Sequence, residues 1–205
     1  MLATEAGVNA IGSAKPRFVS RSGEKLDAAL EAFGLDVTGR TCADFGCNVG
    51  GFTDCLLQRG AERVYAIDTG YGALAWTLRT SDRVVVMERT NALRAAPPER
   101  VDLVTIDVAW TPQVLIVPAA ESWLKPGGRI VSLLKPHYEL EKLRRRKPRS
   151  PLSDAETQDV FREVCGQLAS ATWAVRAAMP SPLRGKGGNV EFLLLLDRGE
   201  TRVGG

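Results

Sequence analysis

The sequence predicts an α/β fold in which a mostly parallel sheet is covered by helices and closed by a C-terminal antiparallel hairpin. Short apolar runs alternate with segments of helical periodicity through the first two thirds of the chain, which is typical of βαβ units. These runs are continuously apolar, as expected for parallel strands that helices cover on both faces. The last two runs are joined by SPLRGKGGN, which is too short for a crossover helix, so we expect them to pair antiparallel.

Length and composition indicate one soluble globular domain. The chain has 205 residues, of which 44% are hydrophobic and 25% charged, and these are ordinary values for a single domain. No apolar run approaches the roughly 20 residues of a membrane-spanning helix. The start, MLATEAGVNAIGSAKPRF, lacks the basic region and apolar centre of a secretory signal. We therefore expect a cytoplasmic protein without membrane contact, with a loose lead-in over residues 1–17, one domain over 18–198 and a tail over 199–205.

The first predicted element is an amphipathic helix over residues 22–33, because Leu26, Leu30 and Phe33 recur at helical spacing. Ser22 is placed to cap this helix and Gly34 to end it. Strands and helices then alternate. Strands are expected at 41–45, 64–67, 84–87, 101–106 and 129–134, and helices at 51–59, 72–79 and 113–123.

The last third of the chain opens with a capping box, SDAE at residues 153–156, which predicts a helix to about Ala169. Two strands follow, at 173–179 and 190–197, and form the hairpin. Five parallel strands closed by an antiparallel hairpin are the layout of a class I, Rossmann-like methyltransferase. A dinucleotide-binding domain more often continues with parallel strands.

A glycine-rich turn, ADFGCNVGGFTD at residues 43–54, joins the first predicted strand to its helix. Its pattern, Asp-x-Gly-x-x-x-Gly-Gly, matches a turn that binds S-adenosylmethionine better than the G-x-G-x-x-G turn that binds a diphosphate. Glycines let the backbone approach a ligand closely, and the Asp44 carboxylate can orient the amino-acid end of this cofactor, directly or through water. A turn that only packs a helix is the alternative. The expected cofactor residues of the turn are Asp44, Gly46, Asn48, Gly50, Gly51 and Phe52.

Polar residues at the ends of the next strands complete the expected cofactor site. Asp68 follows the turn by about twenty residues, where a carboxylate accepts hydrogen bonds from both ribose hydroxyls. A solvated aspartate at a strand end is the alternative. Asn91 follows the third strand, and its amide offers both a donor and an acceptor to an adenine edge. Asp107, which ends the fourth strand, belongs to the same expected set.

Charged residues that end apolar strands predict a reactive centre. Asp107 follows the fourth strand and Lys135 the fifth, so we expect the two to face each other at one edge of the sheet. A carboxylate at the end of a buried strand is costly without such a partner. Glu191 lies near the start of the last strand, and an antiparallel strand begins at that same edge. A purely structural ion pair is the alternative.

The cysteines and the single histidine do not form a metal-binding pattern. Cys42, Cys47, Cys55 and Cys165 contain no C-x-x-C pair, and His137 is the only histidine. We therefore expect buried free thiols and no metal ion.

Six segments together carry a resemblance to a known family: RSGEKLDAALEAFG, DFGCNVGGFTDCLLQRGAERVYAIDTGYGALAW, ERTNA, IDVAW, LLKPHYE and GGNVEFLLLL. They resemble the FtsJ-like ribose 2′-O-methyltransferases, nearest the hemolysin-like TlyA branch of ribosomal RNA methyltransferases, over roughly residues 18–197. The resemblance implies methyl transfer from S-adenosylmethionine to a ribose 2′-hydroxyl of RNA. It maps the Lys-Asp-Lys-Glu tetrad of the family onto Lys25, Asp107, Lys135 and Glu191.

The resemblance also implies a role for each member of this tetrad. Lys135 is expected to act as the base on the hydroxyl, with Lys25 close enough to lower its pKa and to help steer the hydroxyl. Asp107 and Glu191 would hold the lysines and balance their charge. The methyl group would pass in line from sulfonium to oxygen without a metal, and positioning would supply much of the rate.

Two features of the chain differ from the TlyA branch. Proteins of that branch carry an N-terminal S4-like RNA-binding domain, and the roughly 20 residues before the first predicted helix are too few for one. Their glycine-rich segment after the K-P motif is replaced here by ELEKLRRRKPRS, in which Lys142–Arg149 hold six basic side chains in eight positions. This basic run is either a solvated loop or a site that attracts RNA phosphates. RNA recognition is therefore expected from a partner or from this run.

Three functions remain open from the sequence alone. The complete tetrad favours an RNA ribose 2′-O-methyltransferase, and Trp110 and Tyr138 then either stack on a base or form the pocket wall. The missing S4-like domain favours a methyltransferase that acts on a non-RNA acceptor. The third reading is a non-catalytic cofactor-binding module or a membrane-active protein, although no segment is amphipathic enough to insert into a bilayer.

Overall fold

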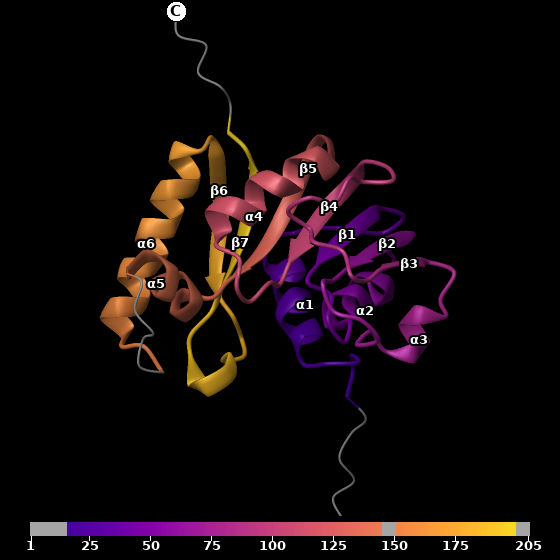
Figure 1. Cartoon of the computed structure of the whole chain (residues 1–205), viewed down its shortest axis with the longest axis horizontal. Coiled ribbons are helices and arrows are strands. Elements are labelled where there is room, and N and C mark those ends of the chain that lie inside the picture. The colour runs from indigo at the N-terminus through magenta and orange to yellow at the C-terminus, as the bar shows by residue number, and fades with distance from the viewer. Residues whose placement is uncertain (1–15, 145–150, 200–205) are drawn as a thin grey trace, which may run out of the picture.

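The computed structural model describes residues 16–144 and 151–199 and confirms the predicted α/β fold. Within these residues, one sheet contains strands in the order β3-β2-β1-β4-β5-β7-β6 (Figure 1). Strands β1 to β5 pair in parallel, whereas β7 is antiparallel to both β5 and β6. The strands are β1 (Thr41–Phe45), β2 (Arg63–Ile67), β3 (Val84–Met87), β4 (Val101–Ile106), β5 (Leu124–Leu134), β6 (Trp173–Pro180) and β7 (Phe192–Arg198).

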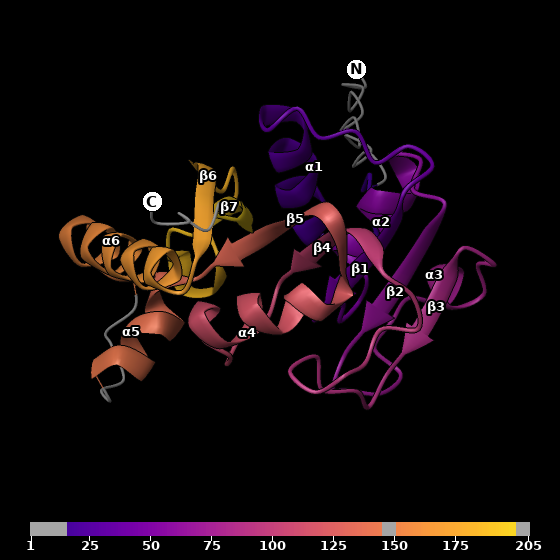
Figure 2. The same cartoon turned by 90° about the horizontal axis from the view of Figure 1, so that it is seen from above.

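Helices cover both faces of the sheet. Figure 2 shows α1 and α2 on one face and α4, α5 and α6 on the other. The helices are α1 (Ser22–Ala32), α2 (Gly51–Gln58), α3 (Trp76–Arg79), α4 (Gln113–Ala120), α5 (Pro136–Arg144) and α6 (Asp154–Ser170), with short 3-10 turns η1 (Glu121–Trp123) and η2 (Lys186–Gly188).

Each face of the sheet has its own hydrophobic core. Leu26 of α1 and Phe52 of α2 belong to one cluster, and Trp123 belongs to the other. Successive residues of β1 alternate between the two cores, since Cys42 packs in the first and Ala43 in the second. Because successive side chains of a strand point to opposite faces, a strand covered on both sides must be apolar throughout.

The first helix lies where it was predicted, but the expected Ser22 cap is wrong. Ser22 is the first residue of α1, Arg21 occupies the N-cap position, and the Ser22 hydroxyl bonds that of Ser20 at 2.7 Å. Gly34 ends the helix as expected, with a φ of +62° that glycine adopts without strain.

Three other elements differ from the prediction. The helix expected at 72–79 is only α3, because Gly72 has a φ of +74° that breaks the helical turn. Strand β5 begins earlier than expected, at Leu124. Helix α5 was not predicted, and it starts with Pro136, whose ring suits the first position of a helix.

The capping box of α6 is confirmed, with the Glu156 backbone N–H donating to Ser153 Oγ at 3.3 Å.

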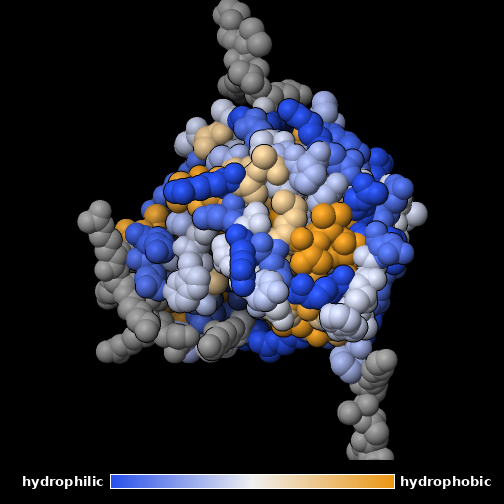
Figure 3. All heavy atoms as spheres, turned by 45° about the vertical axis from the view of Figure 1, so that its right-hand side comes forward, coloured by the Kyte–Doolittle hydropathy of each residue, from blue (hydrophilic) through white to orange (hydrophobic). Residues whose placement is uncertain are grey.

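The surface is mostly hydrophilic on the face seen in Figure 3, which also shows a patch of hydrophobic residues. No helix among the described residues is long and apolar enough to cross a membrane.

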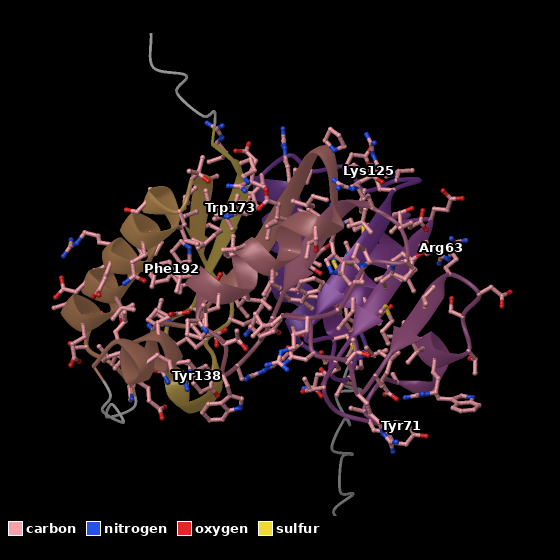
Figure 4. All side chains as sticks on the ribbon, turned by 45° about the horizontal axis from the view of Figure 1, so that its top comes forward. Arg63, Tyr71, Lys125, Tyr138, Trp173 and Phe192 are labelled. Atoms are coloured by element: carbon pink, nitrogen blue, oxygen red, sulfur yellow. The ribbon has the colours of Figure 1, made fainter. Side chains whose placement is uncertain are left out.

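Figure 4 shows Tyr71 and Tyr138 toward one edge of the molecule and Arg63 and Lys125 toward the opposite edge. Because Arg63 and Lys125 lie at the starts of β2 and β5, the first edge is the one where the parallel strands end.

Candidate active site

Asp107 and Lys135 form an ion pair at the edge where the parallel strands end. Asp107 follows β4 and Lys135 follows β5, and these neighbouring strands pair in parallel up to Ile106 and Ser132. Strand pairing therefore carries both side chains to one place. The pair is largely shielded, with 14% of the Lys135 side chain and 20% of the Asp107 side chain exposed to solvent.

Lys25 and Glu191 form a second, more deeply buried ion pair, with 2.5 Å between Lys25 Nζ and Glu191 Oε2. Glu191 immediately precedes β7, whose first residue, Phe192, pairs with Leu134 at the end of β5. Gly185 lies against the Glu191 carboxylate so closely that a Cβ atom there would sit 2.0 Å from Oε1. The antiparallel return of β7 thus brings the glutamate beside Lys25 of α1.

The two ion pairs meet at a small hollow of about 270 Å³, which is lined by Lys25, Lys135 and Asp107. Glu191 is not part of the lining, but it bonds the lining residue Lys25. The structure therefore gathers the four predicted tetrad residues, two lysines and two carboxylates, around one hollow. The other residues of its lining are Ser20, Arg21, Ser22, Gly46, Cys47, Asn48, Val49 and Ala109.

A larger cavity of about 450 Å³ adjoins this hollow and shares Gly46, Asn48, Asp107 and Ala109 with it. Its lining includes four residues expected at the cofactor site in addition to Gly46, namely Asn48, Asp68, Asn91 and Asp107. Trp110, expected as a stacking residue or pocket wall, also lines this cavity. Sequence reasoning missed the rest of the lining, which is Ile67, Thr69, Thr90, Ala92, Val108, Ala109, Thr111 and Ile116. Most of these follow directly after β2, β3 or β4, so their positions at strand ends were the available signal.

Asp68 is fixed at the mouth of this cavity by backbone hydrogen bonds. Its Oδ2 accepts from the Asn48 N–H at 2.9 Å, and its Oδ1 accepts from the Gly70 N–H at 2.7 Å. Each carboxylate oxygen has a second lone pair, so the group can still accept hydrogen bonds from two neighbouring hydroxyls. Asn48 itself has a φ of +47°, in the left-handed region that few non-glycine residues adopt.

Asn91 lines the cavity with its amide partly engaged. Its Oδ1 accepts a hydrogen bond from the Leu93 backbone N–H at 3.0 Å. The amide NH₂ remains the more available part of the side chain, so Asn91 is better arranged to donate to a ligand than to accept from one.

Asp44, which the sequence assigned to the amino-acid end of the cofactor directly or through water, does not line either cavity. It is fully buried, and its carboxylate accepts hydrogen bonds from Thr53 Oγ1 at 2.7 Å and Thr105 Oγ1 at 3.1 Å. Burial raises the pKa of Asp44 to about 7, against the opposing effect of the hydrogen bond from Thr53. Through these hydrogen bonds Asp44 links β1 to α2 and β4, and so stabilises the turn.

Gly50, Gly51 and Phe52 also lie outside both cavities, because they pack against protein. A Cβ on Gly50 would come within 2.3 Å of Leu78 Cδ1. A Cβ on Gly51 would come within 2.0 Å of Ser22 Oγ. Their packing fits the alternative of a turn that packs a helix, whereas Gly46 lines both cavities.

An aromatic pair stands beside the site. The rings of Trp110 and Tyr138 have centroids 4.8 Å apart, and Trp110 is 65% exposed. His137 also packs against Tyr138, with ring centroids 4.1 Å apart. Lys142 is exposed on α5, and the remainder of the basic run lies largely outside the described residues, which stop at Arg144 and resume at Pro151.

The cysteines are free thiols, as expected, with Cys42, Cys47 and Cys55 buried. Burial raises the pKa of Cys42 and of Cys55 to about 12, so both stay protonated at neutral pH. Within residues 16–144 and 151–199, no group of three or more His, Cys, Asp or Glu side chains is arranged to hold a metal ion.

A mostly parallel sheet with an antiparallel last pair, and a cavity of about 450 Å³ at the ends of β1 to β4, are the arrangement expected of S-adenosylmethionine-dependent methyltransferases. The family model described as FtsJ-like methyltransferase matches residues 18–198. The chain belongs to the FtsJ-like methyltransferase family. This confirms the expected family, the enzyme class and S-adenosylmethionine as the methyl donor.

Relatives and solved structures agree with this family. The chain is 42% identical over 185 residues to the 16S/23S rRNA (cytidine-2′-O)-methyltransferase TlyA of Mycobacterium tuberculosis, which covers 87% of this chain and 68% of the relative. It is 39% identical over 184 residues to YqxC of Bacillus subtilis, a candidate rRNA methyltransferase, covering 88% and 66%. The structure of a protein from Streptococcus thermophilus described as a hemolysin superposes with a TM-score of 0.81 at 35% identity, covering 92% of this chain and 70% of that one. The chain thus spans about two thirds of the length of these curated relatives.

Proposed function

We propose that this protein transfers a methyl group from S-adenosylmethionine to the 2′-hydroxyl of an RNA ribose, with Lys135 as the base. The observation that carries this proposal is the hollow in which two lysines, each paired with a carboxylate, adjoin a nucleoside-sized cavity. A ribose hydroxyl is a poor nucleophile until its proton is removed or firmly oriented, and two amino groups converging on one point can do both.

The pairing of the tetrad supports different roles for the two lysines. Lys25 is held by Glu191 within the protein, which suits a residue that orients the hydroxyl. Lys135 and its partner Asp107 both line the hollow, so Lys135 can accept the proton while Asp107 keeps the amino group in place. With both lysines protonated the four charges sum to zero, which limits the cost of keeping them out of water. Lys135 accepts the hydroxyl proton in its neutral amine form.

The residues of the larger cavity fit the cofactor. Asp68 suits the ribose hydroxyls, and Asn91 suits an acceptor atom of the adenine ring. Gly46 and Asn48 line both cavities and would hold the part of the cofactor nearest the reacting methyl. Asp44, Gly50, Gly51 and Phe52 would act indirectly, by shaping the turn. When bound, S-adenosylmethionine supplies an electrophilic methyl group on a sulfonium.

The proposed acceptor is ribosomal RNA, either as free RNA or within an assembled ribosomal subunit. The name of the Mycobacterium tuberculosis relative states that it acts on cytidine 2′-O positions of 16S and 23S rRNA, and its 42% identity supports the same acceptor chemistry here. The exposed Trp110 ring beside Tyr138 is suited to stack on a base. An enzyme with this acceptor would work in the cytoplasm.

We further propose that residues 18–198 form the catalytic domain, flanked by a lead-in at 1–17 and a tail at 199–205. The match of the family model over 18–198 supports this division. Basic residues of the run Lys142–Arg149 would add affinity for the phosphate backbone, with strong salt dependence.

Transfer of radiolabelled methyl groups from S-adenosylmethionine to total RNA and to ribosomal subunits tests the proposal. Lys135→Ala is compared with Lys125→Ala, which removes a lysine that pairs with Asp102 at the opposite edge of the sheet (Figure 4). We expect Lys135→Ala to lower the rate by roughly 100-fold or more with unchanged cofactor binding, and Lys125→Ala to match the wild type. The labelled nucleotide should resist alkaline cleavage, because a methylated 2′-oxygen cannot attack the adjacent phosphate.

Two outcomes would overturn the proposal. If Lys135→Ala keeps the wild-type rate, Lys135 is not the base. If the protein binds S-adenosylmethionine but labels neither RNA nor subunits, the acceptor is another molecule or the protein is a non-catalytic binding module.

A further inference from the structure

Arg21 is an arginine at the rim of the reactive hollow, and the proposed function gives it no role so far. It occupies the N-cap position of α1, is exposed to solvent, and lines the hollow together with Lys25, Lys135 and Asp107. Its guanidinium makes no hydrogen bond or ion pair with any residue in the described parts of the chain. It is therefore a cation available to a ligand.

The backbone around Arg21 is held firmly. The Val19 N–H donates to Asp54 Oδ2 at 2.8 Å, and Gln58 Nε2 donates to the Arg17 carbonyl at 2.9 Å, so this segment is tied to α2. Next to Arg21, the hydroxyls of Ser20 and Ser22 bond each other at 2.7 Å. A fixed backbone below a free guanidinium is suited to binding, because little backbone order has to be gained.

Helical geometry places Arg21 on the same side of α1 as Lys25. Its φ of −62° and ψ of −15° are helical, and it stands four residues before Lys25. Residues with this spacing share a helix face, with Cβ atoms roughly 5–6 Å apart. Arg21 therefore lies one turn outward from the lysine at the floor of the hollow.

The charge balance of the hollow favours an anion at this position. Lys135 is paired with Asp107, and Lys25 is paired with Glu191. Arg21 is the cation of the lining that these carboxylates do not neutralise. The rim therefore presents an unpaired guanidinium directly beside the place where an acceptor hydroxyl would bind.

We propose that Arg21 binds the phosphodiester group that flanks the acceptor ribose, and this inference rests on the proposed function. In RNA the 3′-phosphate is attached to the carbon next to the one that bears the 2′-hydroxyl. A hydroxyl placed between the two lysines thus brings a phosphate to the rim. A guanidinium matches phosphate oxygens with two parallel hydrogen bonds. Arg21 is then a substrate-positioning residue that selects a ribose within an RNA strand over a free nucleoside.

The carboxylate of the cofactor is the competing anion, and two separate measurements distinguish it from RNA phosphate. Arg21→Gln removes the charge, and Arg21→Lys keeps the charge without the two-pronged geometry. The control Arg129→Gln removes an exposed arginine of β5 that lines a separate pocket together with Lys125. Calorimetry gives the Kd for S-adenosylmethionine. Steady-state methyl transfer at several salt concentrations gives kcat and KM for ribosomal RNA.

For Arg21→Gln we expect the KM for RNA to rise roughly tenfold and the slope of log KM against log salt to become shallower by about 1. The Kd for S-adenosylmethionine and the kcat at saturating RNA should stay within about twofold of wild type. Arg21→Lys should recover the salt slope but only part of the KM, and Arg129→Gln should behave as wild type.

A weaker affinity of Arg21→Gln for S-adenosylmethionine, with an unchanged KM for RNA, would assign Arg21 to the cofactor and overturn the inference. Unchanged values for both ligands would also overturn it. If the wild type itself labels no RNA, the proposed function fails first. If the wild type labels RNA and Arg21→Gln keeps its salt dependence, only the inference about Arg21 fails.

Discussion

Glu139 accepts a hydrogen bond from the backbone N–H of Gln113, with 2.8 Å between Glu139 Oε1 and the nitrogen. The bond joins the first turns of α5 and α4, the helices that come after β5 and Lys135 and after β4 and Asp107. Gln113 also accepts from Ser132 Oγ at 2.6 Å, so α4 is tied to β5 as well. This buried crosslink braces the two strand ends that hold the Asp107–Lys135 pair.

Replacing Glu139 is therefore expected to destabilise the protein. Glu139→Ala leaves the buried Gln113 N–H without its acceptor, at a cost of roughly 1–3 kcal/mol in the free energy of unfolding. Glu139→Gln keeps an acceptor oxygen and should cost clearly less. Urea unfolding of both variants measures the difference, and equal losses would mean that the hydrogen bond is not the stabilising contact.

Stability should also depend on pH through two buried acids. Burial raises the pKa of Asp44 and of Glu139 to about 7 each, from ordinary values of 3.8 and 4.5. A raised pKa means that the folded state binds the proton more tightly than the unfolded state. This contribution is complete below the unfolded pKa and is lost as pH rises through the folded value.

We therefore expect the contribution of these two acids to the free energy of unfolding to fall between about pH 4 and about pH 7. Asp44→Asn combined with Glu139→Gln removes both titrating groups and should flatten the profile over this range. Urea unfolding at a series of pH values compares the double variant with wild type. Parallel profiles would contradict the assignment to these acids.

The Lys25–Glu191 pair predicts a contrast between breaking the pair and replacing it. Glu191→Ala leaves Lys25 buried without its partner, which should cost roughly 3–5 kcal/mol of stability. Lys25→Met with Glu191→Leu removes both charges and should recover most of that loss. Neither variant should transfer methyl groups at the wild-type rate, because both disrupt the tetrad.

Unfolding measurements and methyl-transfer assays on the two proteins test this contrast. A double variant as unstable as Glu191→Ala would show that packing volume matters more than charge. A double variant with wild-type methyl transfer would exclude Lys25 and Glu191 from the proposed chemistry.

Asp68 predicts a specific loss of cofactor affinity. Asp68→Ala removes the carboxylate proposed to accept from the ribose hydroxyls, and the acceptor for the Asn48 and Gly70 N–H groups. We expect the Kd for S-adenosylmethionine to rise roughly 10- to 100-fold, the value of one charged hydrogen-bonding group. Asp82→Ala, at an exposed position before β3, is the matched control. Calorimetry measures the Kd for S-adenosylmethionine of both variants. An unchanged Kd in Asp68→Ala would exclude Asp68 from the cofactor site.

Local patterns determined most of the secondary structure. Continuous apolar runs predicted β1 to β4 within a residue, and the capping box predicted the start of α6, because backbone conformation depends on neighbours in sequence. The chemistry of strand ends also predicted that Asp107 and Lys135 would meet, since adjacent parallel strands end at one edge of the sheet. Length and spacing were enough for these conclusions.

Only the tertiary structure decided which residues reach the cavities. Lys25 and Glu191 are 166 residues apart in sequence, and they meet because β7 returns antiparallel beside β5 and α1 packs against the same edge. Asp44 has the spacing of a ligand-binding residue, yet its buried carboxylate accepts hydrogen bonds from Thr53 and Thr105. A one-dimensional pattern records a residue's type and position. Whether its side chain faces solvent, a ligand or the core depends on the packing of segments that the pattern does not connect.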